Sequence, residues 1–185
     1  MFQRQAVEGE EKKRIAQAAA ALIQPGQTIF LGSGSTVSAI VPHIQDMPLT
    51  VISNSLPVIN QLTSHQNIGL IVIGGQLRQS ELSMVGYVAE QAIREFRADT
   101  VFMGMRAGDP KHGFTSDYVD EAMTDRAILK IAPRCVVVAD HTKFGRVSTV
   151  LMAPVTAVNT IISDDKLQPE LAEELRQQGL ELILV

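Results

Sequence analysis

The segment Thr28-Ile-Phe-Leu-Gly-Ser-Gly-Ser-Thr36 shows the order of strand, turn and helix start that recurs along the chain. Its first residues form a short aliphatic run, typical of a strand buried on both faces of a parallel sheet. The glycines and hydroxyls that follow favour a sharp turn into a helix. Further runs of the same kind predict strands at Leu49–Ile52, Gly69–Ile73, Thr100–Met103, Cys135–Ala139, Asn159–Ile162 and Glu181–Val185.

Stretches with helical spacing separate these strands. The clearest is Glu10–Gln24, whose apolar residues share one face and which Pro25-Gly26 ends. The charged run Glu10–Arg14 within it is expected to be a solvated face. Other helices are predicted at Thr36–Gln45, Leu56–Ser64, Tyr87–Phe96, Asp120–Ile131 and Glu170–Gln178.

The alternation of strands and helices predicts an α/β fold. We expect three layers, with helices on both faces of a mostly parallel sheet. Gly104–Val119, rich in glycine and aspartate, is predicted to be one long irregular loop.

Composition excludes several classes of protein. The chain has 185 residues, of which 45% are hydrophobic, and its formal net charge is -4. Such a chain folds as one domain and is not disordered. The negative charge argues against nucleic-acid binding by this domain itself, and no apolar run is long enough to span a membrane. The single cysteine forms no internal disulfide, which favours a cytoplasmic location.

Small, polar or charged residues follow five successive predicted strands. In open α/β sheets ligands bind beyond the carboxyl ends of the strands, so these segments should converge. The first, 32–36, has glycines that let the backbone approach a ligand and leads into a helix N-terminus that suits an anion. The others are Ser53-Asn54-Ser55, Gly74-Gly75 with Arg78 beyond it, the loop from Gly104, and Asp140-His141-Thr142-Lys143-Phe144-Gly145.

Several specific sites are excluded by the same segments. No lysine follows Gly34 in the pattern of a nucleoside-triphosphate loop, and Val37 stands where a dinucleotide fingerprint needs its third glycine. The histidines lack metal-ligand spacing, so neither a metal nor a cofactor is predicted. Cys135 lies within an apolar run and is expected to be a packed core thiol.

The charged candidates each have a plain structural alternative. Lys143 follows a buried strand closely, which favours a ligand contact over a surface position. Asp140 could cap the next turn, and His141 could serve only as a hydrogen-bonding residue. Arg78 could lie on the surface, and Glu121 could simply favour the start of its helix.

Taken in order, these motifs resemble the C-terminal effector-sensing domain of the DeoR family of bacterial repressors. The Ala139-Asp-His-Thr-Lys-Phe-Gly145 segment is the most specific part. The resemblance implies a fold related to ribose-5-phosphate isomerase and a phosphorylated sugar, or a similar metabolite, as ligand. By the resemblance, the phosphate would lie at Ser33, Gly34, Ser35 and Thr36, with Asn54, Gly75 and Lys143 lining the pocket. Ser53, Gly74 and Arg106 complete the candidate phosphate-binding residues. The candidates for sugar contacts are Arg78, Glu121, Asp140 and His141.

The chain departs from the family pattern in two loops. Gly32 stands where members usually have an acidic residue, and Met105-Arg106 replaces a small polar residue and glycine. Arg106 would then supply an additional anion contact.

The resemblance also implies a domain organisation. The family places a winged helix-turn-helix before this domain, so residues 1–9 are predicted to be the tail of a linker and residues 10–185 the sensing domain. The chain could be the sensor half of a longer protein or a free-standing relative. DNA would bind only through the helix-turn-helix, and a homo-oligomer is expected.

Two functions remain. A sensor would bind its effector without turnover and change the geometry of an oligomer. An aldose–ketose isomerase would need a carboxylate base, for which Glu121, Asp109 and Asp140 are candidates, and a cation such as Lys143. The loop after the fourth strand lacks closely spaced acids of the kind such isomerases carry, which favours the sensor.

Overall fold

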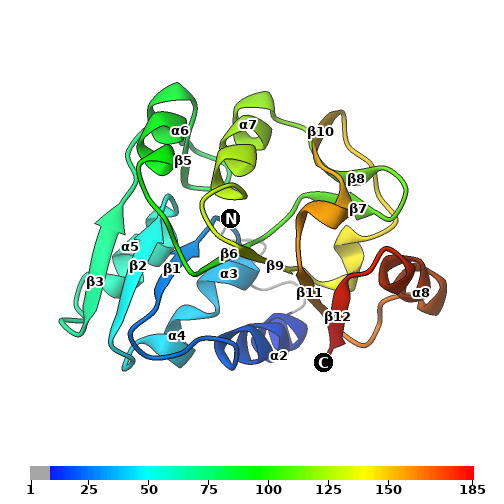
Figure 1. The fold of residues 1–185 in the computed structure, drawn as a ribbon, viewed down its shortest axis with the longest axis horizontal. Helices are drawn as coiled ribbons and strands as arrows, with labels where there is room; N and C mark the ends of the chain where they lie inside the picture. Colours follow the sequence, from blue (N-terminus) through cyan, green and yellow to red (C-terminus); the bar gives the residue numbers. More distant parts are fainter. Residues whose placement is uncertain (1–8) are drawn as a thin grey trace.

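The computed structural model describes residues 9–185 and has a seven-stranded parallel sheet at its centre (Figure 1). Every neighbouring pair of strands in this sheet runs parallel. In spatial order the strands are β12 (Glu181–Leu184), β11 (Thr160–Ser163), β9 (Arg134–Val138), β6 (Thr100–Met103), β1 (Thr28–Leu31), β2 (Leu49–Ser53) and β3 (Ile68–Val72). All the predicted strands are confirmed, with ends that differ by a residue or so.

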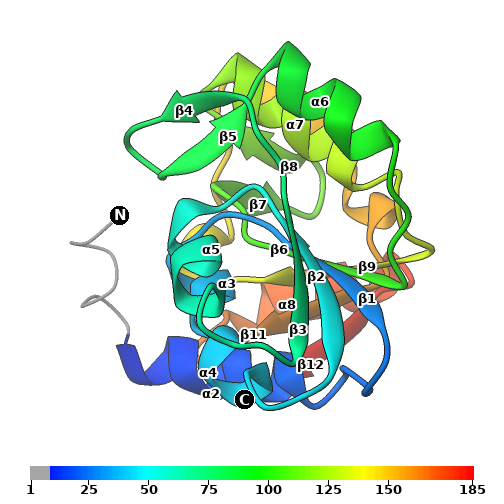
Figure 2. The same ribbon diagram turned by 90° about the vertical axis from the view of Figure 1, so that its left-hand side faces the viewer.

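Helices cover both faces of the sheet, as predicted (Figure 2). One face packs on α2 (Gly9–Ala20), α3 (Ser35–Ser38), α4 (Val41–Ile44) and α5 (Leu56–Leu62). The other packs on α6 (Tyr87–Arg94), α7 (Val119–Ile128) and α8 (Pro169–Gln177). The alternation along β1 shows the division, because Ile29 belongs to the first core and Phe30 to the second.

The predicted helix Thr36–Gln45 is instead two short helices, α3 and α4. Pro42 lies in the first turn of α4, where it has no N–H to continue the hydrogen bonding of α3. A helix as short as α3 has little macrodipole, so its first turn contributes hydroxyl and N–H groups rather than a helix field. The helix predicted at Glu10–Gln24 ends earlier, at Ala20.

The stretch Gly104–Val119 is not the irregular loop that its composition indicates. It contains β7 (Ala107–Asp109) and β8 (Gly113–Ser116), which pair antiparallel. β8 also pairs with β10 (Val150–Ala153), a strand from much later in the chain. Short strands that contain glycine and aspartate give no alternating signal, and their partner is remote, so sequence periodicity could not find them.

A small hairpin, β4 (Gln76–Arg78) and β5 (Ser83–Val85), was likewise not predicted. It contacts the segment that follows β2 through a bridge between Ser55 and Ser83. Two one-turn 3₁₀ segments, η1 (His141–Lys143) and η2 (Val155–Ala157), complete the described elements. The predicted linker lies outside the described residues except for Gly9, which begins α2.

Candidate functional site

A cleft with a volume of about 70 Å³ lies at the carboxyl ends of β1, β6 and β9. This is the edge at which the sequence predicts a ligand site. Several predicted residues line it: Ser33, Gly34, Ser35, Thr36, Arg106, Glu121, Asp140 and Lys143. Lys12, Glu81, Met105, Thr115, Ser116, Asp125 and Met152 also line it.

The 33–36 loop lies against the loop that follows β6. Gly34 has a φ of 121°, a conformation that favours glycine, and a Cβ on Gly104 would come within 3.1 Å of the Ser33 carbonyl. The close approach therefore depends on Gly104 having no side chain, whereas a Cβ on Gly34 would meet only the Gly104 Cα, at 4.0 Å. Ser33, Ser35 and Thr36 line the cleft beside this contact.

Three cationic side chains reach the cleft from different elements. Lys12 comes from α2 and is only 7% exposed, so this part of the charged run 10–14 is buried and the prediction of a solvated face is wrong there. Arg106 follows β6 and forms an ion pair with Asp117, with its Nη2 at 3.0 Å from Oδ2. Lys143 ends η1, and its ammonium forms no ion pair within the described part of the chain.

Carboxylates make up another part of the lining, the acidic wall of the cleft. Glu121, on α7, pairs with the Arg78 guanidinium and accepts a hydrogen bond from the Ser116 hydroxyl at 2.7 Å. Burial, together with the charge of Glu121, raises the pKa of Glu81 and raises the pKa of Asp125 well above its usual range. The wall is therefore rich in hydrogen-bonding oxygen atoms, some of which keep their protons at higher pH than an ordinary carboxylate.

Arg78 itself does not line the cleft. Its guanidinium carbon lies 4.6 Å from the centre of the Tyr118 ring, and Nη2 lies 3.7 Å from the Asp117 carboxylate. Together with the Glu121 pair, these contacts place Arg78 behind the acidic wall. It holds Glu121 in position.

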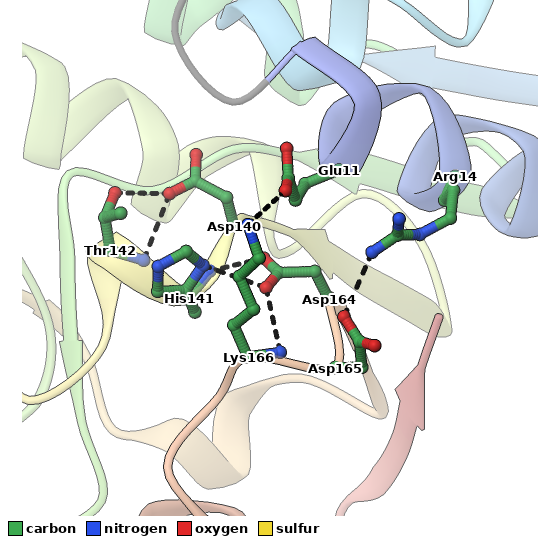
Figure 3. A network of polar contacts seen from close by, with 8 residues as sticks. All are labelled: Glu11, Arg14, Asp140, His141, Thr142, Asp164, Asp165 and Lys166. Carbon is green, nitrogen blue, oxygen red and sulfur yellow. Dashed lines mark hydrogen bonds and ion pairs between the residues drawn. The ribbon is translucent and has the colours of Figure 1, made fainter.

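Asp140 and His141 hold the loop that carries Lys143 (Figure 3). Asp140 is 1% exposed and caps η1, accepting hydrogen bonds from the backbone N–H and the hydroxyl of Thr142. His141 lies outside the cleft lining, and its Nδ1 is 2.8 Å from the Asp164 carboxylate. His141 is thus the hydrogen-bonding residue that the structural alternative predicts, whereas Asp140 both caps the turn and borders the cleft.

The same network reaches α2, as Figure 3 shows. Lys166 pairs with Glu11, and Arg14 pairs with Asp165 at 3.0 Å. The helix that brings Lys12 to the cleft is thereby tied to the loop that follows β11.

The remaining predicted residues do not line the cleft. The Ser53 hydroxyl donates to the Leu31 carbonyl at 2.7 Å, and the Asn54 amide donates to the Met84 carbonyl at 2.9 Å. Gly74 and Gly75 form the turn into the β4–β5 hairpin, and a Cβ on Gly75 would lie 2.9 Å from the Ala89 Cβ. These residues join the hairpin to the main sheet.

Sequence reasoning missed Lys12, Glu81 and Asp125. All three lie on helices or in a hairpin loop, away from the carboxyl ends of the main strands on which the prediction relied. Only the buried positions of Lys12 and Glu81, 7% and 8% exposed, distinguish them from surface charges, and burial is a tertiary property.

Cys135 and the histidines add no further site. Cys135 is 3% exposed, which confirms the predicted core thiol, and burial raises its pKa to about 11. Among residues 9–185, no group of three His, Cys, Asp or Glu side chains could hold a metal ion. No helix in that range is both long and apolar enough to cross a membrane.

Comparison with known proteins gives a consistent picture. Residues 7–165 match the family model of the DeoR C-terminal sensor domain. Over 175 residues the chain is 33% identical to the putative aga operon transcriptional repressor of Escherichia coli O157:H7, covering 94% of this chain and 65% of that protein. It is 31% identical to the glycerol-3-phosphate regulon repressor of Escherichia coli K12, covering 87% of this chain and 64% of that protein. The chain thus spans about two thirds of the length of these relatives.

The solved structures show the fold. Ribose-5-phosphate isomerase A of Methanocaldococcus jannaschii superposes with a TM-score of 0.52 at 17% identity, over 72% of this chain and 53% of that one. The fold relationship implied by the sequence motifs is confirmed.

Proposed function

The chain belongs to the sensor-domain family of DeoR-type transcriptional repressors, and on that basis we propose that its cleft binds a phosphorylated sugar as an effector without converting it. The relatives named above are repressors rather than enzymes. One of their names refers to glycerol 3-phosphate, a phosphorylated polyol, which resembles the proposed class in carrying a phosphate and hydroxyls on one carbon chain.

The observation that carries the proposal is the mixed lining of the cleft. It includes Ser33, Ser35 and Thr36 together with Lys143, whose ammonium forms no ion pair within the described residues, and such donors suit a phosphate group. It also includes Glu81, Glu121 and Asp125, whose oxygens can accept hydrogen bonds from sugar hydroxyls. A molecule that carries both a phosphate and hydroxyls satisfies both kinds of lining residue.

Catalysis of isomerisation is less well supported, because each candidate base has another role. Asp109 lies outside the cleft lining and contacts His112 Nδ1 at 2.8 Å. Both Glu121 oxygens are held, by Arg78 and by Ser116, and one oxygen of Asp140 is held by Thr142. A base that abstracts a carbon-bound proton needs a free oxygen directed at the substrate.

The rest of the regulator follows the family organisation. We expect residues 10–185 to be the sensing domain, residues 1–9 to be part of a linker, and DNA to bind through a helix-turn-helix domain in a cytoplasmic homo-oligomer. Effector binding would favour one arrangement of that oligomer over another and so change the affinity for DNA.

A thermal-shift panel of sugar phosphates tests the proposal, with each hit then incubated and analysed for isomer formation. We expect at least one sugar phosphate to stabilise the protein without product. Lys143→Ala should weaken that ligand about ten-fold or more, the cost of losing a charge-assisted hydrogen bond. Lys130→Ala, an exposed lysine away from the cleft, serves as the control.

Three results would overturn the proposal. They are the absence of stabilisation by every sugar phosphate, turnover that depends on a carboxylate of the cleft, and an unchanged affinity in Lys143→Ala.

A further inference from the structure

A second cleft adjoins the first and is more basic. Arg106 and Lys143 line both clefts, and Arg146 and Ser148 line only the second. Among the described residues, Asp117 is the one carboxylate on the lining of the second cleft. The first cleft, in contrast, is lined by Glu81, Glu121, Asp125 and Asp140. An anionic group therefore meets less repulsion in the second cleft than along most of the first.

The segment that carries Arg146 is fixed at both ends. Phe144 is 6% exposed and forms a bridge with Gly108 of β7. The backbone N–H of Ser148 donates to the Thr115 hydroxyl of β8 at 2.8 Å. Gly145, with a φ of 66°, turns the chain between these anchors. Arg146 thus extends from a short, anchored segment beside the mouth of the first cleft.

The cations of the second cleft are poorly neutralised by the protein. Within the described part of the chain, Arg146 and Lys143 form no ion pair. Arg106 pairs with Asp117, but their side chains are 36% and 45% exposed, and such pairs contribute little to stability. Like charges gathered on one lining favour an anion that is not part of the protein.

We propose that the second cleft receives a second anionic group of the same ligand, so that the preferred effector is a sugar carrying two anionic groups. A sugar bisphosphate and a phosphorylated sugar acid both have this chemistry. The proposal rests on the proposed function, because the first anionic group lies at the 33–36 loop. Arg106 and Lys143 stand between the two groups, and Arg146 contacts only the second.

Matched pairs of ligands test the proposal by calorimetry on the full chain. Fructose 6-phosphate is compared with fructose 1,6-bisphosphate, and glucose 6-phosphate with 6-phosphogluconate. We expect at least one member with two anionic groups to bind about ten-fold more tightly than its partner, which corresponds to about 1.4 kcal/mol. The two pairs distinguish a second phosphate from a carboxylate.

Arg146→Gln identifies the cleft responsible. It should remove most of the ten-fold advantage while leaving the affinity for the monophosphate unchanged, since Arg146 does not line the first cleft. Arg176→Gln is the matched control, because Arg176 is exposed on α8 and lines neither cleft. It should keep both affinities.

The outcomes separate this inference from the proposed function. Equal affinity within both pairs, with the monophosphates bound, overturns the second subsite and leaves the sensor function in place. An equal loss of both affinities in Arg146→Gln, or the same loss in Arg176→Gln, also overturns it, because the effect is then one of overall charge. Failure of every ligand to bind overturns both proposals.

Discussion

Replacing Asp164 by alanine should destabilise the fold strongly, because its carboxylate is fully buried and both of its oxygens have hydrogen-bond partners. Asp164 is 0% exposed. Its oxygens accept hydrogen bonds from the backbone N–H groups of His141 at 2.7 Å and Lys166 at 3.1 Å. They also contact the His141 ring at 2.8 Å (Figure 3). In the alanine variant two backbone donors and one ring nitrogen lose their partner.

The magnitude follows from these contacts. Leaving a buried polar group without a partner costs roughly 1–3 kcal/mol, so three such groups give a loss of about 3–5 kcal/mol when the exposed part of His141 is rehydrated. For a chain of this length each kcal/mol lowers Tm by about 2–4 °C. We therefore expect Asp164→Ala to lower Tm by at least about 6 °C.

Asp165→Ala is the matched control on the next residue. Its side chain is 71% exposed and has an ion pair with Arg14 at 3.0 Å, a contact that contributes about 1 kcal/mol or less. Circular dichroism melts of the three proteins at neutral pH make the comparison. If Asp164→Ala melts within about 3 °C of wild type, or no lower than Asp165→Ala, the account of the network is refuted.

Three further predictions concern other parts of the fold. Gly113→Ala should lower the free energy of unfolding, measured with urea, by about 2–4 kcal/mol, since Gly113 has a φ of 78° and a Cβ there would collide with the Ala153 carbonyl. The control Gly26→Ala, at a φ of 86° but with open space around the Cβ, should lower it by about half as much or less. Cys135 should resist thiol reagents in the native protein at pH 8 and react only after unfolding, because burial raises its pKa to about 11; rapid native labelling would contradict this. Burial raises the pKa of Asp125 in the folded state, so the protonated acid favours folding, and this stabilisation is lost as the pH rises from about 4 through the raised pKa. The Tm of Asp125→Asn should therefore rise relative to the Tm of wild type between pH 5 and pH 9. A Tm difference that stays constant over this range would contradict the prediction.

The main sheet could be predicted from the sequence because its signal is local. Each strand is a short aliphatic run, and the run 135–138, Cys-Val-Val-Val, is 3% exposed or less throughout. Since both faces of the sheet are covered, most residues of such a strand are apolar, and no partner is needed to recognise it. The order of strands and helices then limits the connections to right-handed crossovers.

The small sheets could not be predicted, because their stability depends on remote partners. β8 has the sequence Gly-Phe-Thr-Ser and pairs with β10 about 35 residues later. Gly113 is needed there because it packs against the Ala153 carbonyl, a contact that no sequence pattern contains. The acidic wall depends on this arrangement, since Ser116 at the end of β8 donates to Glu121.

For the site, the sequence by itself determined which strand ends carry polar groups and that Lys143 stands close to a buried strand. Both features can be read from the order of residues along the chain, because parallel strands bring their carboxyl ends to one edge of the sheet. Only the tertiary structure decided which of these groups share a cleft. It directed Asn54 to the hairpin and Ser53 to the neighbouring strand β1, and it turned His141 toward Asp164. It also buried Lys12 beside the 33–36 loop, because burial depends on which elements pack together and not on a residue's place in its own segment.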